Sequence, residues 1–566
     1  MKSHSAGVSW FPLLYTPWVT TTTRDTPKQR QSLNVSYHLL RVPPTHSQMR
    51  LLDPMHACLN VDEILRGISR ELIGTPGGEG AVVALACCCK SFEDPVLDTL
   101  WIRQNELLPL LWTFPEDVWN DDGWIVSGPT TCMCFRLIKA LIRKSFKRLP
   151  TATEWGRFRK YARRMRKLIE YHIPDIPSLE PLSAMQLCTI NEPLVPNLQS
   201  LELFEVHGPF IPFIPLFLSP RTTSIFLMFS EYDCPKAMVA SVVTTLPKLC
   251  PSLQTINLLS LPRDPMITTA ISEMVLATNR DTLQTFRVDS PLTKEADEVV
   301  YKLSNLRDLS IVIEKVASLS STSLPNLTGL TIKCKNEHEW PQLFHGATLG
   351  KLESVVFHPE SGEIGDFLGA FERVALSSSI QHTLSMFCIY SSNSWNPNYS
   401  SLLPFTQLVN LVVKFYCGEG CSSRVDDNII IGLSRAMPKL KVLELGYEPC
   451  RESTTGVTAK GLLALALHCP DLQRLCIHIQ VSSLSVPPAR PGIGRNTEST
   501  ASWTDCALTN ITAGDIPMPE ESALMVALTL LRIFPRIVRT GGGNAGWRKV
   551  DDAIYFSKRI VDYSSK

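Results

Sequence analysis

The sequence predicts an α/β protein in which a small N-terminal helical domain precedes a long repeat solenoid, with a parallel sheet and outer helices. Three observations lead to this fold class. The chain has 566 residues, more than one ordinary core of about 250–300 residues can fill. A short apolar pattern recurs from residue 198 to residue 477, and residues 58–105 lack this pattern and show helical periodicity instead. Hydrophobic residues make up 44% of the chain, which is enough to bury an extended core.

Residues 1–54 are predicted to be a flexible leader. They contain many Ser and Thr residues, and Pro12 and Pro17 interrupt their apolar stretch, which argues against a signal peptide. The longest apolar runs of the chain are shorter than the ~20 residues that a membrane helix needs, so we expect no membrane span. The formal net charge of +1 gives no overall field that would attract the chain to a nucleic acid or a membrane.

Residues 55–110 are predicted to form a small domain of three short helices. Ile64, Leu65, Ile68 and Leu72 follow a helical spacing, and a glycine-rich loop, Gly74–Gly80, comes next. A helix of small residues follows, with a break expected at Asp94–Pro95 and a last helix that ends at Trp101. A domain of this size buries little core by itself, so we expect it to need a partner surface.

A helical basic linker is predicted over residues 111–175. Residues 136–167 contain thirteen Lys and Arg residues and one acid, Glu154, with aromatic residues between them. This pattern fits either a surface for nucleic acid or phosphate, or a solvated helical face. We favour the solvated face, because no nucleic-acid-binding motif accompanies the basic stretch.

The repeat solenoid is predicted over residues 176–480. Five segments share the order Pro-polar-Leu-x-x-apolar-x-apolar, and we number the positions of this hexad from its first leucine. Including copies without proline, the hexads begin at positions 198, 222, 253, 283, 306, 327, 352, 384, 408, 440 and 472. Positions four and six lie on one side of a strand and are expected to face the core. Helices are expected between strands, as at Asp264–Thr278, Glu363–Leu376, Asp427–Met437 and Ala459–His468. This combination is typical of a leucine-rich repeat, whose stacked units form a horseshoe.

The C-terminal part is predicted to close the stack. Residues 481–503 are rich in Ser, Pro and Gly and are expected to be a flexible insertion. Residues 504–566 are expected to hold a degenerate repeat at Leu508–Ile511, a helix at Ser522–Phe534, a closing strand at Pro535–Val538 and a terminal helix at Val550–Arg559. Such an atypical cap covers the last core face of a repeat array.

No pattern of catalytic or metal-binding residues emerges from the sequence. The seventeen cysteines include no Cys-x-x-Cys pair, so they are interpreted as reduced, mostly buried thiols of a cytoplasmic or nuclear protein. Nucleophile and phosphate-loop motifs are also missing. We therefore expect a non-enzymatic protein without a cofactor, the other possibility being an enzyme whose site has no recognisable motif.

The helical domain resembles the F-box. It has Glu63, Ile64, Leu65 and Ile68 of the family's opening Leu-Pro-x-Glu-Ile-Leu-x-x-Ile, with Asn60 in place of the proline. Cys88–Phe92 is similar to Val-Cys-Lys-x-Trp, with phenylalanine in place of tryptophan, and Leu100–Trp101 to the later Leu-Trp. An F-box followed by leucine-rich repeats looks like the F-box proteins of mushroom-forming fungi, and Thr153–Phe158 resembles their junction.

The resemblance implies a substrate-recognition subunit of an SCF-type cullin–RING ubiquitin ligase, which binds a Skp-type linker subunit and a target protein. The residues expected to bind the linker are Leu59, Ile64, Leu65, Ile68, Leu72, Cys89, Phe92 and Trp101. The target is expected on the concave sheet, whose side chains alternate with the core leucines. The candidates there are Glu202, Arg287, Asp289, Lys333, His358, Lys414, Glu444, Arg474 and His478. The alternative is an interaction scaffold with no ligase role, whose first helices only cap the repeats.

Overall fold

The structure is a computed structural model in which one compact unit, Asn60–Lys566, contains every described residue. The described residues are 61–120, 146–171, 180–188, 192–230, 233–278, 280–313, 324–334, 349–359, 367–378, 380–391, 397–415, 425–446, 456–484, 506–512, 520–541 and 545–564. The predicted leader, residues 1–54, lies outside them.

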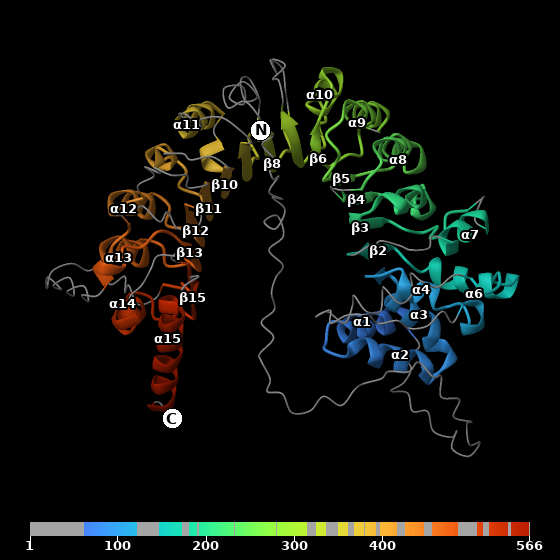
Figure 1. Ribbon diagram of the computed structural model, residues 1–566, viewed down its shortest axis with the longest axis horizontal. Coiled ribbons are helices and arrows are strands. Elements are labelled where there is room, and N and C mark those ends of the chain that lie inside the picture. The colour runs from blue at the N-terminus through green and yellow to red at the C-terminus, as the bar shows by residue number, and fades with distance from the viewer. Residues whose placement is uncertain are drawn as a thin grey trace, which may run out of the picture. The chain divides into compact units, whose positions relative to one another are not determined.

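Within these ranges, fifteen strands form one parallel sheet in which the spatial order equals the chain order. The sheet is open, and each strand from the second to the fourteenth pairs with the strand before it and the strand after it (Figure 1). The strands are β1 Arg103–Gln104, β2 Lys167–Glu170, β3 Ser200–Val206, β4 Ser224–Phe229, β5 Thr255–Leu259, β6 Thr285–Pro291, β7 Asp308–Ile313, β8 Gly329–Cys334, β9 Ser354–Pro359, β10 Met386–Ser391, β11 Asn410–Phe415, β12 Val442–Leu445, β13 Arg474–Cys476, β14 Asn510–Thr512 and β15 Arg539–Gly541.

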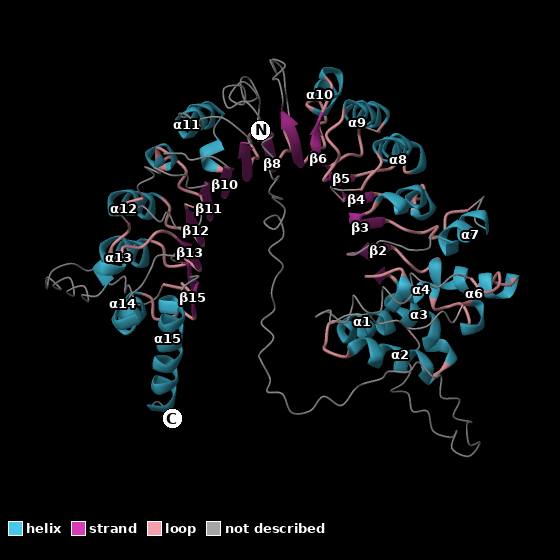
Figure 2. Cartoon of the chain, in the orientation of Figure 1, coloured by secondary structure: helices cyan, strands magenta, loops and turns pink. Residues whose placement is uncertain are grey.

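Among the described residues, helices cover one face of this sheet and none lies on the other face, which we call the uncovered face (Figure 2). The α-helices are α1 Asp62–Ile73, α2 Gly78–Cys88, α3 Lys90–Trp101, α4 Leu108–Leu111, α6 Ala152–Ala162, α7 Glu180–Cys188, α8 Lys236–Leu249, α9 Pro265–Ala277, α10 Lys294–Val300, α11 Phe367–Ser378, α12 Asp427–Ala436, α13 Ala459–His468, α14 Ala523–Ile533 and α15 Ala545–Ser564. Short 3-10 helices are η2 Glu116–Val118, η3 Gly208–Phe217, η5 Ile380–His382, η6 Tyr399–Leu402, η7 Val481–Leu484 and η9 Glu520–Ser522.

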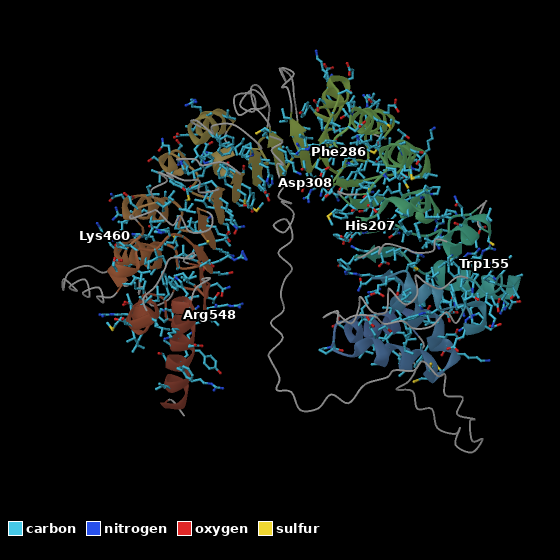
Figure 3. The ribbon with its side chains drawn as sticks, viewed as in Figure 1. Trp155, His207, Phe286, Asp308, Lys460 and Arg548 are labelled. Atoms are coloured by element: carbon cyan, nitrogen blue, oxygen red, sulfur yellow. The ribbon has the colours of Figure 1, made fainter. Side chains whose placement is uncertain are left out.

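The predicted repeat register is confirmed. The residues at position four of successive hexads are partners in the sheet, beginning with Leu201 and Ile225 and continuing to Leu475 and Ile511. Positions one, four and six are buried throughout, as Phe286, labelled in Figure 3, illustrates. Burial of one large apolar side chain stabilises a fold by roughly 1.5–3 kcal/mol. The repeated hexads therefore build one continuous core, which extends from Trp101 to Ile554.

The outer helices begin where the sequence provides capping groups. Asp264 accepts a hydrogen bond from the Met266 backbone N–H (2.9 Å) at the start of α9, where Pro265 is the first helical residue. Asp427 of α12 accepts one from the backbone N–H of Thr458 (2.8 Å), the N-cap of α13. Side-chain carboxylates thus accept N–H groups at the start of their own helix, as Asp264 does, or at the start of the next helix, as Asp427 does.

The sheet extends beyond residues 176–480 at both ends. β1 lies in the segment predicted as the helical domain, and β2 lies in the predicted basic linker. Sequence analysis did not predict β2, because Glu170 occupies position six of this hexad, where the other predicted hexads have an apolar residue. At the other end, Leu508–Ile511 contains the predicted degenerate repeat, but the closing strand is Arg539–Gly541 and not Pro535–Val538.

Other boundaries also differ from the prediction. The terminal helix is Ala545–Ser564 rather than Val550–Arg559, and the helix predicted at Glu363–Leu376 is Phe367–Ser378. The break in the helical domain lies at Cys89, which has extended backbone angles, and α3 continues through Asp94 and Pro95. A proline there removes only one helical hydrogen bond, and Pro95 is itself buried in the packed face of α3. Residues 481–484 form η7, with Val481 and Leu484 buried, so they are not part of a flexible insertion. Residues 485–505 lie outside the described part of the chain.

Candidate functional site

The helices α1, α2 and α3 pack into a small unit whose interior is contributed by all three. Leu65 of α1, Val82 of α2 and Val96 of α3 are buried. The turn between α1 and α2 explains the glycine-rich loop. Gly77 has a φ of +78°, and a Cβ on Gly78 would lie 1.6 Å from the Leu72 carbonyl oxygen. Only glycine fits there without a shift of the backbone.

Of the predicted linker-binding residues, those on one side of α1 reach the surface. Ile64 is 40% exposed and Ile68 is 37% exposed, and they are one helical turn apart. Val61 and Val83, which were not predicted, are also exposed. Cys89 is exposed, whereas Leu72 and Phe92 are half-buried. A hydrogen bond with the Ser91 hydroxyl is the main cause that lowers the pKa of the Cys89 thiol.

Two of the predicted linker-binding residues are buried, and one lies outside the described residues. Leu65 is 1% exposed and Trp101 is 9% exposed, so both lie in the interior. Trp101 packs on Tyr161 of α6, with ring centroids 4.8 Å apart. Both residues match the F-box pattern, and their side chains pack among the helices. Leu59 lies outside the described residues.

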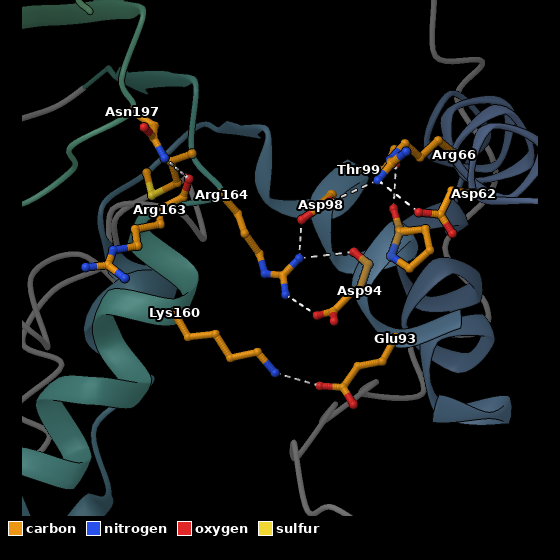
Figure 4. A network of polar contacts seen from close by, with 12 residues as sticks. Asp62, Arg66, Glu93, Asp94, Asp98, Thr99, Lys160, Arg163, Arg164 and Asn197 are labelled. Carbon is orange, nitrogen blue, oxygen red and sulfur yellow. Dashed lines mark hydrogen bonds and ion pairs between the residues drawn. The ribbon is translucent and has the colours of Figure 1, made fainter. Parts of the chain in front are cut away.

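Ion pairs join this helical unit to α6 and to the start of the sheet. Arg164 pairs with Asp94 and Asp98 of α3, and Lys160 pairs with Glu93 (2.9 Å), as Figure 4 shows. Arg66 of α1 lies 3.4 Å from Asp98, so one aspartate connects α1 and the residues that follow α6. Several contacts therefore hold the helical unit against the first strands.

The same contacts account for part of the basic stretch 136–167. Arg148 pairs with Asp117 (2.6 Å) and Glu154 (2.8 Å), and Lys167 pairs with Glu202 (2.5 Å). The hydrogen bonds from Arg148 are the main cause that lowers the pKa of Glu154 to about 2. Cations that are clustered in the sequence thus meet acids from distant segments. Residues 136–145 lie outside the described part of the chain.

The uncovered face of the sheet is formed by positions three, five and seven of each hexad, which alternate with the core positions. All nine predicted target-binding residues belong to these positions. Glu202 and Arg287 are each in an ion pair, with Lys167 and with Asp308, respectively. Asp289 differs, because its carboxylate accepts hydrogen bonds from the backbone N–H groups of Ser260 and Leu261. Ser260 has a φ of 53°, so the Asp289 carboxylate supports a turn with unusual backbone angles.

The structure brings the other candidates together, with the exception of His478. Lys333, His358 and Lys414 occupy position seven of β8, β9 and β11, and Tyr390 occupies position seven of β10. Glu444 of β12 pairs with both Lys414 (2.7 Å) and Arg474 (3.2 Å). The polar ladder is defined as these six residues: Lys333, His358, Tyr390, Lys414, Glu444 and Arg474. His478 lies at position seven of the last predicted hexad, after the end of β13, and is half-buried.

Sequence analysis missed the aromatic residues of this face. Tyr390 lies in the centre of the polar ladder, stacked on His358 with ring centroids 5.1 Å apart. At the other end of the sheet, Phe204 stacks on Tyr171 at 5.0 Å and contacts Phe226 at 4.6 Å. A search of positions three, five and seven of the predicted hexads for aromatic as well as charged residues would have found Phe204, Phe226 and Tyr390, but not Tyr171, which follows the unpredicted strand β2.

In the described part of the chain, none of the helices has both the length and the apolar composition that crossing a membrane requires. Three or more His, Cys, Asp or Glu side chains in a metal-binding arrangement are likewise not found among the described residues. No protein-family model matches the chain, and no curated protein gives a significant match to it.

Proposed function

We propose that this chain is the substrate-recognition subunit of an SCF-type cullin–RING ubiquitin ligase. In this proposal α1–α3 are an F-box that binds a Skp-type linker subunit, and the leucine-rich repeats bind a target protein. The observation that carries the proposal is the exposed apolar side of α1, formed by Val61, Ile64 and Ile68, in a helical unit that is held against an open sheet. An exposed cluster of large apolar side chains is typical of a protein-binding site.

The arrangement suits a subunit that connects two proteins. The linker would bind at α1, and the target would bind on the uncovered face of the sheet. Ion pairs of Arg164 and Lys160 between these parts would limit their relative motion. The ubiquitin-transfer chemistry would belong to partner proteins in the cytoplasm or nucleus, and this chain would contribute proximity.

The first prediction concerns Ile64→Asp, which places a charge in the middle of the proposed linker interface. An unpaired charge in an apolar interface costs roughly 3–5 kcal/mol, or several hundredfold in affinity. We expect the variant to lose binding to a purified Skp-type subunit in isothermal titration calorimetry. Its melting temperature should stay close to that of the unchanged chain, because the Ile64 side chain is exposed.

Leu276→Asp is the matched control, since Leu276 is an exposed apolar residue of α9, far from α1 in the chain. We expect this variant to bind the linker like the unchanged chain. If the unchanged chain does not bind a Skp-type subunit, or if Ile64→Asp binds it equally well, the F-box assignment is wrong. The chain would then be an interaction scaffold whose first helices cap the repeats.

A further inference from the structure

The C-terminal half of α15 has an exposed apolar side. The N-terminal half of this helix packs against β15 and α14 at the end of the array (Figure 1), where Trp547 and Ile554 are fully buried. After Ile554 come three large apolar side chains that are exposed. Tyr555 is 53% exposed, Phe556 is 61% exposed and Ile560 is 69% exposed. Three such side chains so close together on one helix are typical of a protein-binding site.

Two exposed residues of opposite charge flank these aromatic residues. Asp552 and Arg559 are seven residues apart, which is about two helical turns, so they lie on the same side of α15. Tyr555 and Phe556 lie between them, with ring centroids 5.8 Å apart. The Arg559 guanidinium carbon lies 5.0 Å from the centroid of the Tyr555 ring. The α15 surface is defined as these four residues together with Ile560.

The order of charges on the α15 surface is complementary to itself. In an antiparallel pair of α15 helices with a two-fold axis between Tyr555 and Phe556, each Asp552 lies opposite the Arg559 of the other copy. The symmetry repeats every contact, so the pair contains two such ion pairs, and the aromatic residues of both copies meet at the axis. In a parallel pair each Asp552 would face a second Asp552, which is unfavourable. The charges therefore specify the antiparallel arrangement.

We propose that the α15 surface joins two copies of this chain in an antiparallel dimer. The surface of each copy spans about two and a half helical turns, which is smaller than the ~800 Å² per partner of a standard stable interface. The dimer is therefore weak, and we expect a dissociation constant of about 10–100 µM. A lipid bilayer fits this surface less well, because the Asp552 carboxylate would meet the anionic headgroups. The proposal does not rest on the proposed function.

The test is sedimentation equilibrium of the full chain at concentrations from about 1 to 200 µM. We expect a monomer at the low end of this range and mostly a dimer at the high end. Phe556→Ser removes an aromatic ring from both copies at the axis and should weaken dimerisation at least about tenfold. The matched control is Leu276→Ser, since Leu276 is an exposed apolar residue of α9, and it should dimerise like the unchanged chain.

An exchange of charges tests the antiparallel arrangement. Asp552→Arg alone, or Arg559→Asp alone, places like charges opposite each other at two points and should weaken dimerisation at least about tenfold. Both substitutions in one chain restore opposite charges, and the dissociation constant should return to within about threefold of the unchanged value. A mixture of the two single variants should form a mixed dimer, because one copy then supplies only cations and the other only carboxylates. Melting of each variant at about 1 µM, where the chain is mostly monomeric, checks that its fold is intact.

Several results would overturn the inference. They are a monomer at every concentration, a dimer that the Phe556 or single charge variants leave unchanged, a doubly substituted chain as weak as the single variants, or an equal loss in the control variant. Binding of the Skp-type subunit, measured on the same proteins, separates the two proposals, because α1 precedes the first strand and α15 follows the last. A monomeric chain that binds the linker contradicts this inference alone. A dimer that does not bind the linker contradicts the proposed function alone.

Discussion

Glu170 is the residue that departs most from the repeat pattern. It occupies position six of β2, where its sheet partner is the buried Leu203. Its Oε2 atom accepts a hydrogen bond from the Leu107 backbone N–H (2.9 Å). Burial raises the pKa of Glu170 to about 8, and the neighbouring Glu106 adds to this shift. The carboxyl group is therefore mostly protonated at neutral pH, which lets it take an apolar position.

This pKa predicts how stability depends on pH. The unfolded chain loses the Glu170 proton near pH 4.5, whereas the folded chain keeps it until about pH 8. Between these values the folded state binds more protons, so the free energy of unfolding decreases as the pH rises. The upper limit of this loss is about 1.4 kcal/mol per pH unit. Glu170→Gln keeps the acceptor for Leu107 and should remove this loss, which urea unfolding at pH 5, 7 and 9 measures.

Glu202→Gln is the control for this measurement, because Glu202 is paired with Lys167 on the uncovered face of the next strand. We expect it to leave the loss of stability above pH 5 in place. If Glu170→Gln and the unchanged chain show the same pH dependence, Glu170 is ionised in the folded protein and the assignment of its proton is wrong.

At the scale of elements, the contact between α3 and the segment after α6 determines how firmly the helical unit is held. Arg164 has a side chain that is 11% exposed, and it also donates to the Asp94 carbonyl oxygen at 3.1 Å. Its carboxylate partners on α3 are more exposed to water than Arg164 itself. Solvent screening therefore limits the contribution of each pair to the free energy of unfolding.

We expect Arg164→Met to loosen this contact without unfolding the sheet. The loss should be about 1–2 kcal/mol, since an exposed pair is weak and a half-buried one is stronger. Amide hydrogen exchange in α1–α3 should become faster, while exchange in β4–β11 stays unchanged. Arg163→Met, at the neighbouring exposed residue, is the control and should have a smaller effect. Equal effects of both variants would show that the Arg164 ion pairs do not hold the helical unit.

At the scale of the whole molecule, stability depends on the stacking of each repeat on its neighbours. Every strand from β2 to β14 lies between two others, and the apolar positions of successive repeats form one core. The ends of such an array need a cap. The C-terminal end is covered by α14 and by α15, whose Trp547 and Val550 are fully buried.

A chain that ends at Ile313 should therefore aggregate or melt at a temperature lower by several degrees. The cut removes β8, the partner of β7, and exposes the core face beneath Leu309 and Ile311. The control is removal of residues 557–566 only, from the part of α15 where Phe556 and Ile560 are exposed. That chain should melt near the unchanged value by differential scanning calorimetry. A monomeric 1–313 fragment as stable as the full chain would mean that the stack consists of independent domains.

The sequence alone determined the repeat register, the helix at Ala459–His468, the helix at Asp427–Ala436 to within one residue, and the alternation that assigns positions three, five and seven to the uncovered face. These features follow from local patterns, because each hexad must bury the same positions against the next. The tertiary structure decided what depends on residues far apart in the chain. Arg164 donates a hydrogen bond to Asp98, which lies 66 residues away in the chain. Leu65 and Trp101 are buried, and Tyr390 stacks on His358. Such contacts depend on which segments the stack places side by side, and no local periodicity encodes that.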